Sequence, residues 1–362
     1  MTRLQTMVDR KSAERDRPVD ELLERMVNRG TVPGVVYLVV DRGATVYAWH
    51  GGAVGRDSTF MLSSTTKVIT ALAVMQLAER GLLDVQDPVS LYYPDSPYPQ
   101  TLKLTHLLSH SGGVPNPAPL RWLHLETEHE THDEARALSS VLADHSRLSF
   151  EPGERYQYSN LGYWLLGFVI EAVAKQDLED YLHDHVRGPL QIPTEELSFQ
   201  IQDPERMAVG HQRRSFLGFV LYLLTERKIW AERKGHWRRV RRLYHDGRAY
   251  GGLYASAGAL QRVLQDLLND EPALIGRSFR DQLFAPQKTN AGSPLGTTLG
   301  WSEGVLGGVR WVGKPGGGPG FFSNARIYPA RGRGTILLAN CTEVRERQIN
   351  RLSDQLDAHF LD

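Results

Sequence analysis

The chain has 362 residues, of which 41% are hydrophobic and 23% are charged, a composition typical of a soluble globular protein with a large core. Its 42 basic and 42 acidic residues cancel, so no overall field draws it onto nucleic acid. The single cysteine, Cys341, excludes an intrachain disulfide and a zinc site built from cysteines, and is compatible with a reducing compartment.

The sequence shows no membrane or export signal. The first 26 residues are charged throughout and lack the apolar core of a signal peptide. The most apolar stretch, 216–224, is far shorter than the ~20 residues of a membrane-spanning helix. We therefore expect a cytoplasmic protein with no stable membrane insertion.

The first third of the chain predicts a helix, a hairpin and a buried helix, in that order. Residues 18–29 have helical apolar spacing, and 34–40 and 45–49 are β-rich runs joined by a turn. Residues 65–80 have a helical pattern that ends at Gly81 and has almost no polar face, which indicates a helix at the centre of the molecule.

The middle of the chain, from about 100 to 285, alternates short helical patterns with loops. Strand patterns return near the C-terminus and are followed by a last helix over 343–360; the predicted strands are 299–305, 309–312, 321–328 and 334–340. We expect an α/β fold of the α+β type, with a central antiparallel sheet built from both termini and flanked by helices. An inserted, mostly helical lobe completes it. The expected lobes are 1–70 with 286–362, and 71–285.

A first chemical motif is Ser63-Ser64-Thr65-Thr66-Lys67 at the start of the predicted central helix. Lys67 follows Ser64 by three residues, so it shares the same helical face and reaches the Ser64 hydroxyl as a base. Ser63 has Thr66 at that spacing and no base. The alternative is that Ser64 only caps the helix and Lys67 is a solvated charge. Against it, this lysine stands in an apolar helix, where an unpaired ammonium is costly.

A second motif is Tyr158-Ser159-Asn160, which precedes a helical pattern over 161–172. A phenol near lysines, with a lowered pKa, would act as general base for the serine. Asn160 would orient Lys67 and the substrate. The alternative is that Asn160 is a helix cap and Tyr158 a half-buried aromatic residue.

A third motif is Lys314-Pro315-Gly316-Gly317-Gly318. Successive glycines on a strand edge let substrate approach the backbone closely, which makes Gly316 a substrate-binding candidate. The Gly317 and Ser64 amides would form an oxyanion hole, and Lys314 would add positive potential near Tyr158. The alternative is a plain glycine-rich turn, and the lysine precedes the glycines, unlike in a phosphate-binding loop.

Together, and in this order, the three motifs resemble the S-x-x-K, Y-x-N and K-T-G triplet of class C β-lactamases and their relatives. These include D-alanyl-D-alanine carboxypeptidases, D-aminopeptidases and family VIII esterases of the penicillin-binding-protein superfamily. Segments 104–115, 251–260 and 299–301 also resemble the family. The resemblance implies a β-lactamase/transpeptidase-like fold and an acyl-serine intermediate. Two positions depart from the pattern: Pro315 replaces the threonine that helps bind a β-lactam carboxylate, and Ala259 replaces a common aspartate.

We expect a carboxylesterase for short-chain or small acyl esters, with Ser64, Lys67 and Tyr158 catalytic and no metal or cofactor. Two features favour this activity: the sequence shows no signal peptide, and Pro315 stands where a threonine would help to bind a β-lactam carboxylate. The alternatives are a β-lactamase or D-Ala-D-Ala carboxypeptidase/D-aminopeptidase, an acyltransferase, and a non-catalytic member that binds a ligand. The expected partner is a small-molecule ester or amide and not nucleic acid, and the protein would be a monomer or a homodimer.

Two segments lie outside these motifs. Residues 124–134 contain three histidines and five carboxylates, but their spacing matches no zinc signature and we expect a solvated loop. His106 and His110 are expected to pack and to stabilise a loop.

Residues 216–248 combine an apolar run with a basic segment, 227–248, that carries nine lysines and arginines. We expect a helical hairpin there, and as a hypothesis a lid over the cleft that touches lipid peripherally or a second copy of the chain.

Overall fold

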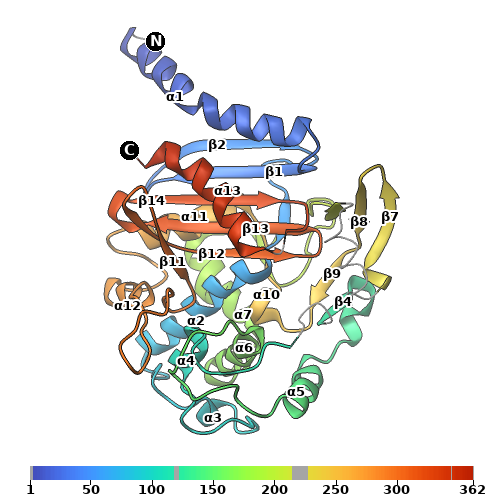
Figure 1. Cartoon of the computed structure of the whole chain (residues 1–362), viewed down its shortest axis with the longest axis vertical. Coiled ribbons are helices and arrows are strands. Elements are labelled where there is room, and N and C mark those ends of the chain that lie inside the picture. The colour runs from blue at the N-terminus through green and yellow to red at the C-terminus, as the bar shows by residue number, and fades with distance from the viewer. Residues whose placement is uncertain (1–2, 118–121, 214–226, 344, 362) are drawn as a thin grey trace.

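The computed structural model describes residues 3–117, 122–213, 227–343 and 345–361 (Figure 1). Its centre is a six-stranded antiparallel sheet in the order β11-β12-β13-β14-β1-β2. The strands are β1 Gly34–Val40, β2 Thr45–Gly52, β11 Ser302–Leu306, β12 Val309–Gly318, β13 Phe321–Tyr328 and β14 Arg333–Ala339. Because β1 pairs with β14, with Leu38 opposite Ile336, both ends of the chain build one sheet, as predicted.

The sheet is covered on both faces, which explains why every residue of β1 is buried. Val35, Tyr37 and Val39 face an outer layer formed by α1 Arg3–Asn28, α13 Glu346–Asp357 and η8 Ala358–Phe360. The alternate residues of β1 face the main core. Figure 1 shows α1 running along the β2 side of the sheet and its N-terminal end extending away from the body.

A buried ion pair fastens α13 to the sheet. Arg326 on β13 and Asp357 on α13 both have fully buried side chains, 3.2 Å apart. Asp357 also accepts hydrogen bonds from the hydroxyls of Tyr37, Tyr328 and Thr335. A buried carboxylate with this many donors fixes the helix in register against three strands.

The predicted central helix is α2 Lys67–Glu79, preceded by the short turn η1 Ser63–Thr66. Residues Lys67 to Leu77 are all buried, as its apolar pattern predicted. Helix α2 contacts α6 Asn160–Ala174, α10 Arg248–Gly251 and α12 Arg277–Leu283 of the helical lobe. Helix α11 Ala257–Leu268 packs on β14 and β1, so this helix belongs with the sheet although it lies within 71–285.

Shorter elements complete the lobe. The helices are α3 Val89–Tyr92, α4 Leu104–Leu108, α5 Glu134–Asp144, α7 Leu178–Leu182, α8 Gly188–Leu190 and the turns η3 Glu126–Thr131, η4 His183–Arg187, η5 Thr194–Glu196 and η6 Arg227–Ile229. The small sheets are β3 Thr59–Met61 with β10 Tyr254–Ser256 and β5 Leu197–Ser198, β4 Leu123–Leu125 with β9 Leu243–His245, and β6 His211–Arg213 with β8 Trp237–Val240 and β7 Trp230–Lys234. None of the helices in the described ranges combines the length and apolarity needed to cross a membrane.

The basic segment 227–248 is not the helical hairpin that we expected. It forms η6, the β7–β8 hairpin and β9, while 216–224 lies outside the described residues. Two of its positive charges are paired with acidic side chains from an earlier part of the chain: Lys228 with Glu128 at 2.8 Å, and Arg242 with Glu126 at 3.5 Å. Because these partners come from about 100 positions earlier, a count of charges within the segment does not include them.

Candidate active site

The Ser63–Ser64 turn holds one hydroxyl at the surface of the core. From residue 59 to residue 77, Ser64 is the only residue that is not buried. Ser63 precedes it in the left-handed backbone region, with φ of +47°, a conformation that a β-carbon disfavours. The Thr65 hydroxyl donates to the Lys314 carbonyl oxygen at 2.8 Å, which ties the turn to β12. The turn is therefore fixed, and it presents Ser64 rather than Ser63.

Lys67 is a buried amine and not a solvated charge. Its side chain is fully buried, and its Nζ donates to the Asn160 Oδ1 and to the Tyr250 carbonyl oxygen, both at 2.7 Å, and to the Ser64 Oγ at 3.4 Å. All three acceptors are neutral. Burial, with a smaller contribution from the charge of Lys314, holds the pKa of Lys67 well below its usual value. Lys67 can therefore be an uncharged base within reach of the serine.

Tyr158 completes the contact with the serine. Its hydroxyl lies 2.6 Å from the Ser64 Oγ, and its ring lies 4.8 Å from the Lys314 Nζ and 5.0 Å from the Lys67 Nζ. The expectation of a lowered pKa is wrong. Burial of the hydroxyl raises the pKa of Tyr158 far above that of a free phenol and outweighs the hydrogen bond to Ser64, which acts in the opposite direction. The phenol is thus protonated in the resting site.

Asn160 is a positioning group and not the helix cap. The cap of α6 is Ser159, whose Oγ accepts from the Gly162 N–H at 3.0 Å. Asn160 is the first residue of the helix and is 6% exposed, and its side-chain oxygen faces Lys67. This oxygen aims the amine at the site without adding a negative charge that would raise its pKa.

The glycine-rich motif is a strand edge and not a turn. Lys314–Gly318 is the end of β12; it pairs with β13, whereas β11 pairs only with 309–313. From 311 to 328, Gly317 is the only residue that is not buried. A β-carbon on Gly316 would lie 2.1 Å from the Leu62 carbonyl oxygen, so only glycine lets the strand pass this close to the serine turn.

Lys314 is buried beside Tyr158 and is 2% exposed. Burial lowers its pKa to about 8, and the carboxylate of Glu346 acts in the opposite direction. A group that titrates this close to neutral pH makes the charge of the site sensitive to pH.

His110 and His106 have the packing roles that we expected. His110 is 2% exposed, and its ring lies 4.4 Å from Tyr158 and 5.0 Å from Tyr163. Burial lowers its pKa well below the usual value for histidine. His106 Nδ1 accepts from the Lys103 N–H at the start of α4.

The structure brings together the five nominated side chains and places Gly316 against the serine turn; the five are Ser64, Lys67, Tyr158, Asn160 and Lys314. It also adds one group that the sequence did not nominate. The addition is the carbonyl oxygen of Tyr250 at the Lys67 Nζ. A backbone acceptor leaves no mark in a side-chain pattern. The only sequence signal was its position directly before the family-like segment 251–260.

Comparisons with known proteins agree with this geometry. The profile of the β-lactamase family matches residues 19–358. Penicillin-binding protein 4* of Bacillus subtilis (strain 168) is 26% identical over 80% of this chain and 62% of its own length. The chain spans less than two thirds of the length of the curated relatives that it matches.

Two solved structures share the fold. The D-amino acid amidase of Ochrobactrum anthropi SV3 has a TM-score of 0.76 at 18% identity, over 96% of this chain and 99% of that chain. A D-stereospecific amidohydrolase from Streptomyces sp. has a TM-score of 0.72 at 22% identity, over 93% and 96%. The family match, the shared fold and the serine, lysine and tyrosine contacts agree. The chain therefore belongs to the β-lactamase family.

Proposed function

We propose that the protein hydrolyses small carboxylic esters through an acyl-enzyme on Ser64. The observation that carries this proposal is the position of the Ser64 Oγ. It is the one partly exposed side chain of a buried turn, 2.6 Å from the Tyr158 hydroxyl and 3.4 Å from the Lys67 Nζ. A serine becomes a nucleophile when a base this close takes its proton.

The pKa directions of Lys67 and Tyr158 support the following order of proton steps. Neutral Lys67 accepts the proton of Ser64, directly or through the Tyr158 hydroxyl, while Oγ forms a bond to the substrate carbonyl carbon. Tyr158 then gives its proton to the leaving alkoxide, and the Lys67 ammonium replaces that proton. Water repeats the sequence on the acyl-serine and releases the acid. The amides of Ser64 and Gly317 hold the oxyanion in this scheme, and Lys314 and Gly316 line the substrate side.

The third motif favours esters over β-lactams. Pro315 has neither a side-chain hydroxyl nor a backbone N–H to offer a substrate carboxylate. It stands on the part of β12 that β11 does not cover, where a substrate would lie. An ester without a carboxylate does not need this hydrogen bond, so the proline does not weaken its binding.

Amide hydrolysis, on D-amino acid amides, is the second candidate. An amine leaving group must be protonated as it departs, and a phenol with a raised pKa beside Ser64 is a proton donor in the right place. The amidase of Ochrobactrum anthropi and the amidohydrolase of Streptomyces share this fold, which supports testing this class of substrate.

The test compares the wild type with Ser64→Ala, and uses Ser63→Ala as a matched control because the Ser63 Oγ is buried without a hydrogen-bond partner. The substrates are p-nitrophenyl esters of C2 to C12 acids, D- and L-phenylalanine amides and a chromogenic cephalosporin. A fluorophosphonate probe, located by peptide mass spectrometry, reports the nucleophile.

Ester turnover and probe labelling that Ser64→Ala abolishes and Ser63→Ala retains would support the proposal. D-amide turnover above ester turnover would move the assignment to the second candidate. Activity that survives in Ser64→Ala would overturn the nucleophile, and a folded wild type that ignores the probe would indicate a ligand-binding member.

A further inference from the structure

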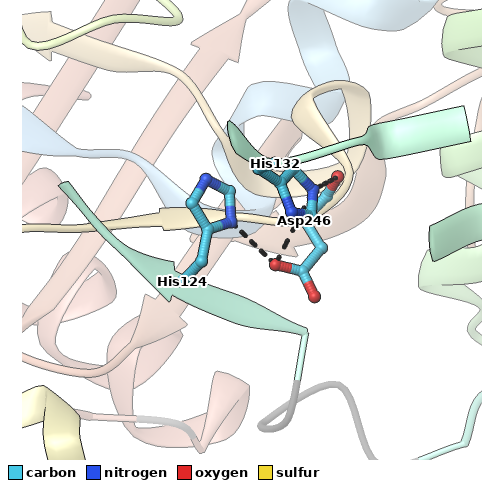
Figure 2. A group of neighbouring side chains, drawn as sticks. All are labelled: His124, His132 and Asp246. Carbon is cyan, nitrogen blue, oxygen red and sulfur yellow. Dashed lines mark hydrogen bonds and ion pairs between the residues drawn. The ribbon is translucent and has the colours of Figure 1, made fainter. Parts of the chain in front are cut away.

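A cluster of metal-binding side chains lies outside the serine site. His124 is on β4, His132 follows η3, and Asp246 follows β9 (Figure 2). One potential ligand atom from each residue lies within 4.8 Å of the other two. In the parts of the chain that the structure describes, no other group of histidine, cysteine or carboxylate side chains meets this criterion.

The histidines of this run do not form the solvated loop that their sequence suggested. The side chain of His124 is 7% exposed, and those of His132 and Asp246 are 18% and 16% exposed. The rings of His124 and His132 are stacked, with centroids 3.9 Å apart. Strand β4 pairs with β9, which places Asp246 beside residues more than 110 positions earlier.

The distances suit one ion shared by three ligands. The Asp246 Oδ1 lies 2.8 Å from the His124 Nδ1 and 4.0 Å from the His132 Nε2. Ligand atoms bound to one metal at ~2.0–2.2 Å stand roughly 3–3.5 Å apart. The first of the two distances is slightly shorter than that separation and the second is slightly longer.

The surroundings resemble the outer shell of a metal site. A metal-binding histidine usually engages a partner through its second ring nitrogen, which fixes the orientation of the ring. Here the His124 Nε2 lies 2.9 Å from the His129 Nδ1. The Asp246 N–H donates to the Trp122 carbonyl oxygen at 3.0 Å, which fixes the start of the loop that carries the carboxylate.

We propose that His124, His132 and Asp246 bind one divalent transition-metal ion, with zinc as the first to test. A set of two imidazoles and one carboxylate binds such ions in preference to calcium or magnesium, which favour oxygen ligands alone. Three protein ligands leave a coordination position for water. The ion joins β4, the end of η3 and the end of β9, so it stabilises the folded chain.

The site stands apart from the nucleophile but is linked to it by hydrogen bonds. The Trp122 carbonyl oxygen accepts from the Asp246 N–H and from the Tyr250 hydroxyl, and the Tyr250 carbonyl oxygen accepts from Lys67. Because of this link, a change at the cluster could also alter turnover at the serine. Metal binding is therefore measured directly and not through turnover.

The experiment uses the full chain, treated with a chelator and then dialysed. Zinc is titrated by calorimetry, and cobalt is titrated by its visible absorption, which reports the coordination geometry of the bound ion. The variants are His132→Ala and Asp246→Asn. The matched control is His183→Ala, an exposed histidine elsewhere, since the chain has 13 histidines and a nonspecific site would involve any of them.

The expected result is one equivalent of zinc bound by the wild type and by His183→Ala, with affinity at least ~100-fold weaker in both cluster variants. Zinc is also expected to raise the melting temperature of the wild type and not that of His132→Ala. Circular dichroism establishes that each variant is folded. His132 is partly exposed, so its variant remains a valid test if Asp246→Asn misfolds. A wild type that binds no stoichiometric zinc, or folded cluster variants that bind as tightly as the wild type, would overturn the site.

Discussion

The hydroxyl of Tyr158 and the Oγ of Ser64 lie 2.6 Å apart, although 94 positions separate them in the chain. Burial keeps the phenol protonated, whereas it favours the neutral form of Lys67. The same desolvation therefore produces one acid and one base around one nucleophile. In the proposed mechanism, the amine of Lys67 is therefore the first base and the phenol of Tyr158 is a proton relay.

Replacing Tyr158 with phenylalanine removes the relay and keeps the ring. We expect kcat to fall by ~10²–10⁴-fold, because a positioned acid–base group contributes about that much. The free energy of unfolding should change by only ~1 kcal/mol, since one hydrogen bond to a partly exposed serine is lost. Steady-state kinetics and urea denaturation measure the two quantities. Tyr156→Phe, at an exposed neighbour, is the control, and an unchanged kcat in Tyr158→Phe would refute the relay.

Asn160→Asp tests the charge state of Lys67 through the pH profile. A carboxylate 2.7 Å from the ammonium favours the charged form and raises the pKa of Lys67. The neutral base is then populated only at higher pH, so the acid limb of kcat/KM is expected to move to higher pH. Asn160→Ala adds no charge and serves as the control. An acid limb that stays in place in Asn160→Asp would exclude Lys67 as the base.

The basic limb of the wild-type pH profile reports Lys314. Activity that needs charged Lys314 is expected to decline as the pH rises through about 8.

Gly316→Ala tests how closely β12 approaches the serine turn. The added β-carbon would lie 2.1 Å from the Leu62 carbonyl oxygen and 2.8 Å from the Thr65 nitrogen, both of them backbone atoms. We expect a loss of ~1–3 kcal/mol in the free energy of unfolding, with a loss of at least ~10-fold in kcat/KM as the turn shifts. Gly43→Ala is the matched control, because its β-carbon would meet nothing within 4 Å. Equal behaviour of the two variants would contradict the close approach.

Pro315→Thr tests the basis of substrate choice. Threonine at this position adds a hydroxyl and a backbone N–H on the uncovered edge of β12. We expect acylation by a penicillin to become ~10-fold faster, since a hydrogen bond to a charged carboxylate is worth about 1.5–3 kcal/mol. Ester turnover is expected to stay within a factor of a few. Mass spectrometry of the acyl-enzyme measures the rate of acylation. The control is Pro315→Val, because valine resembles threonine in shape but has no hydroxyl. Equal gains in both variants would show that the hydroxyl is not responsible.

Sequence reasoning succeeded where the information was local or periodic. Ser64 and Lys67 lie three residues apart, so helical geometry alone predicted their contact. The β1 and β14 strands have strong β patterns, and the lack of a polar face in 65–76 predicted the burial of α2. These patterns, with the family resemblance, were enough to predict the sheet and the serine motif.

The remaining features depend on partners that are distant in the chain. The direction of the Tyr158 pKa follows from its burial, which a motif does not encode. The basic segment forms strands, and two of its charges, on Lys228 and Arg242, are paired with Glu128 and Glu126 from an earlier part of the chain. Likewise, the histidine run has no zinc spacing because its third ligand, Asp246, comes from 122 positions after His124. No local window contains these pairs.

The pairing of β1 with β14 has a consequence for synthesis on the ribosome. Strand β1 is complete at Val40, whereas its partner begins at Arg333. At ~5–20 residues per second, the ribosome needs about 15–60 s to make the intervening chain. Throughout this interval β2 covers only one edge of the uncharged segment Gly34–Val40, and an apolar strand with an open edge readily pairs with other chains. The yield of folded protein in a cell therefore depends on how well this strand is shielded until the last strands emerge.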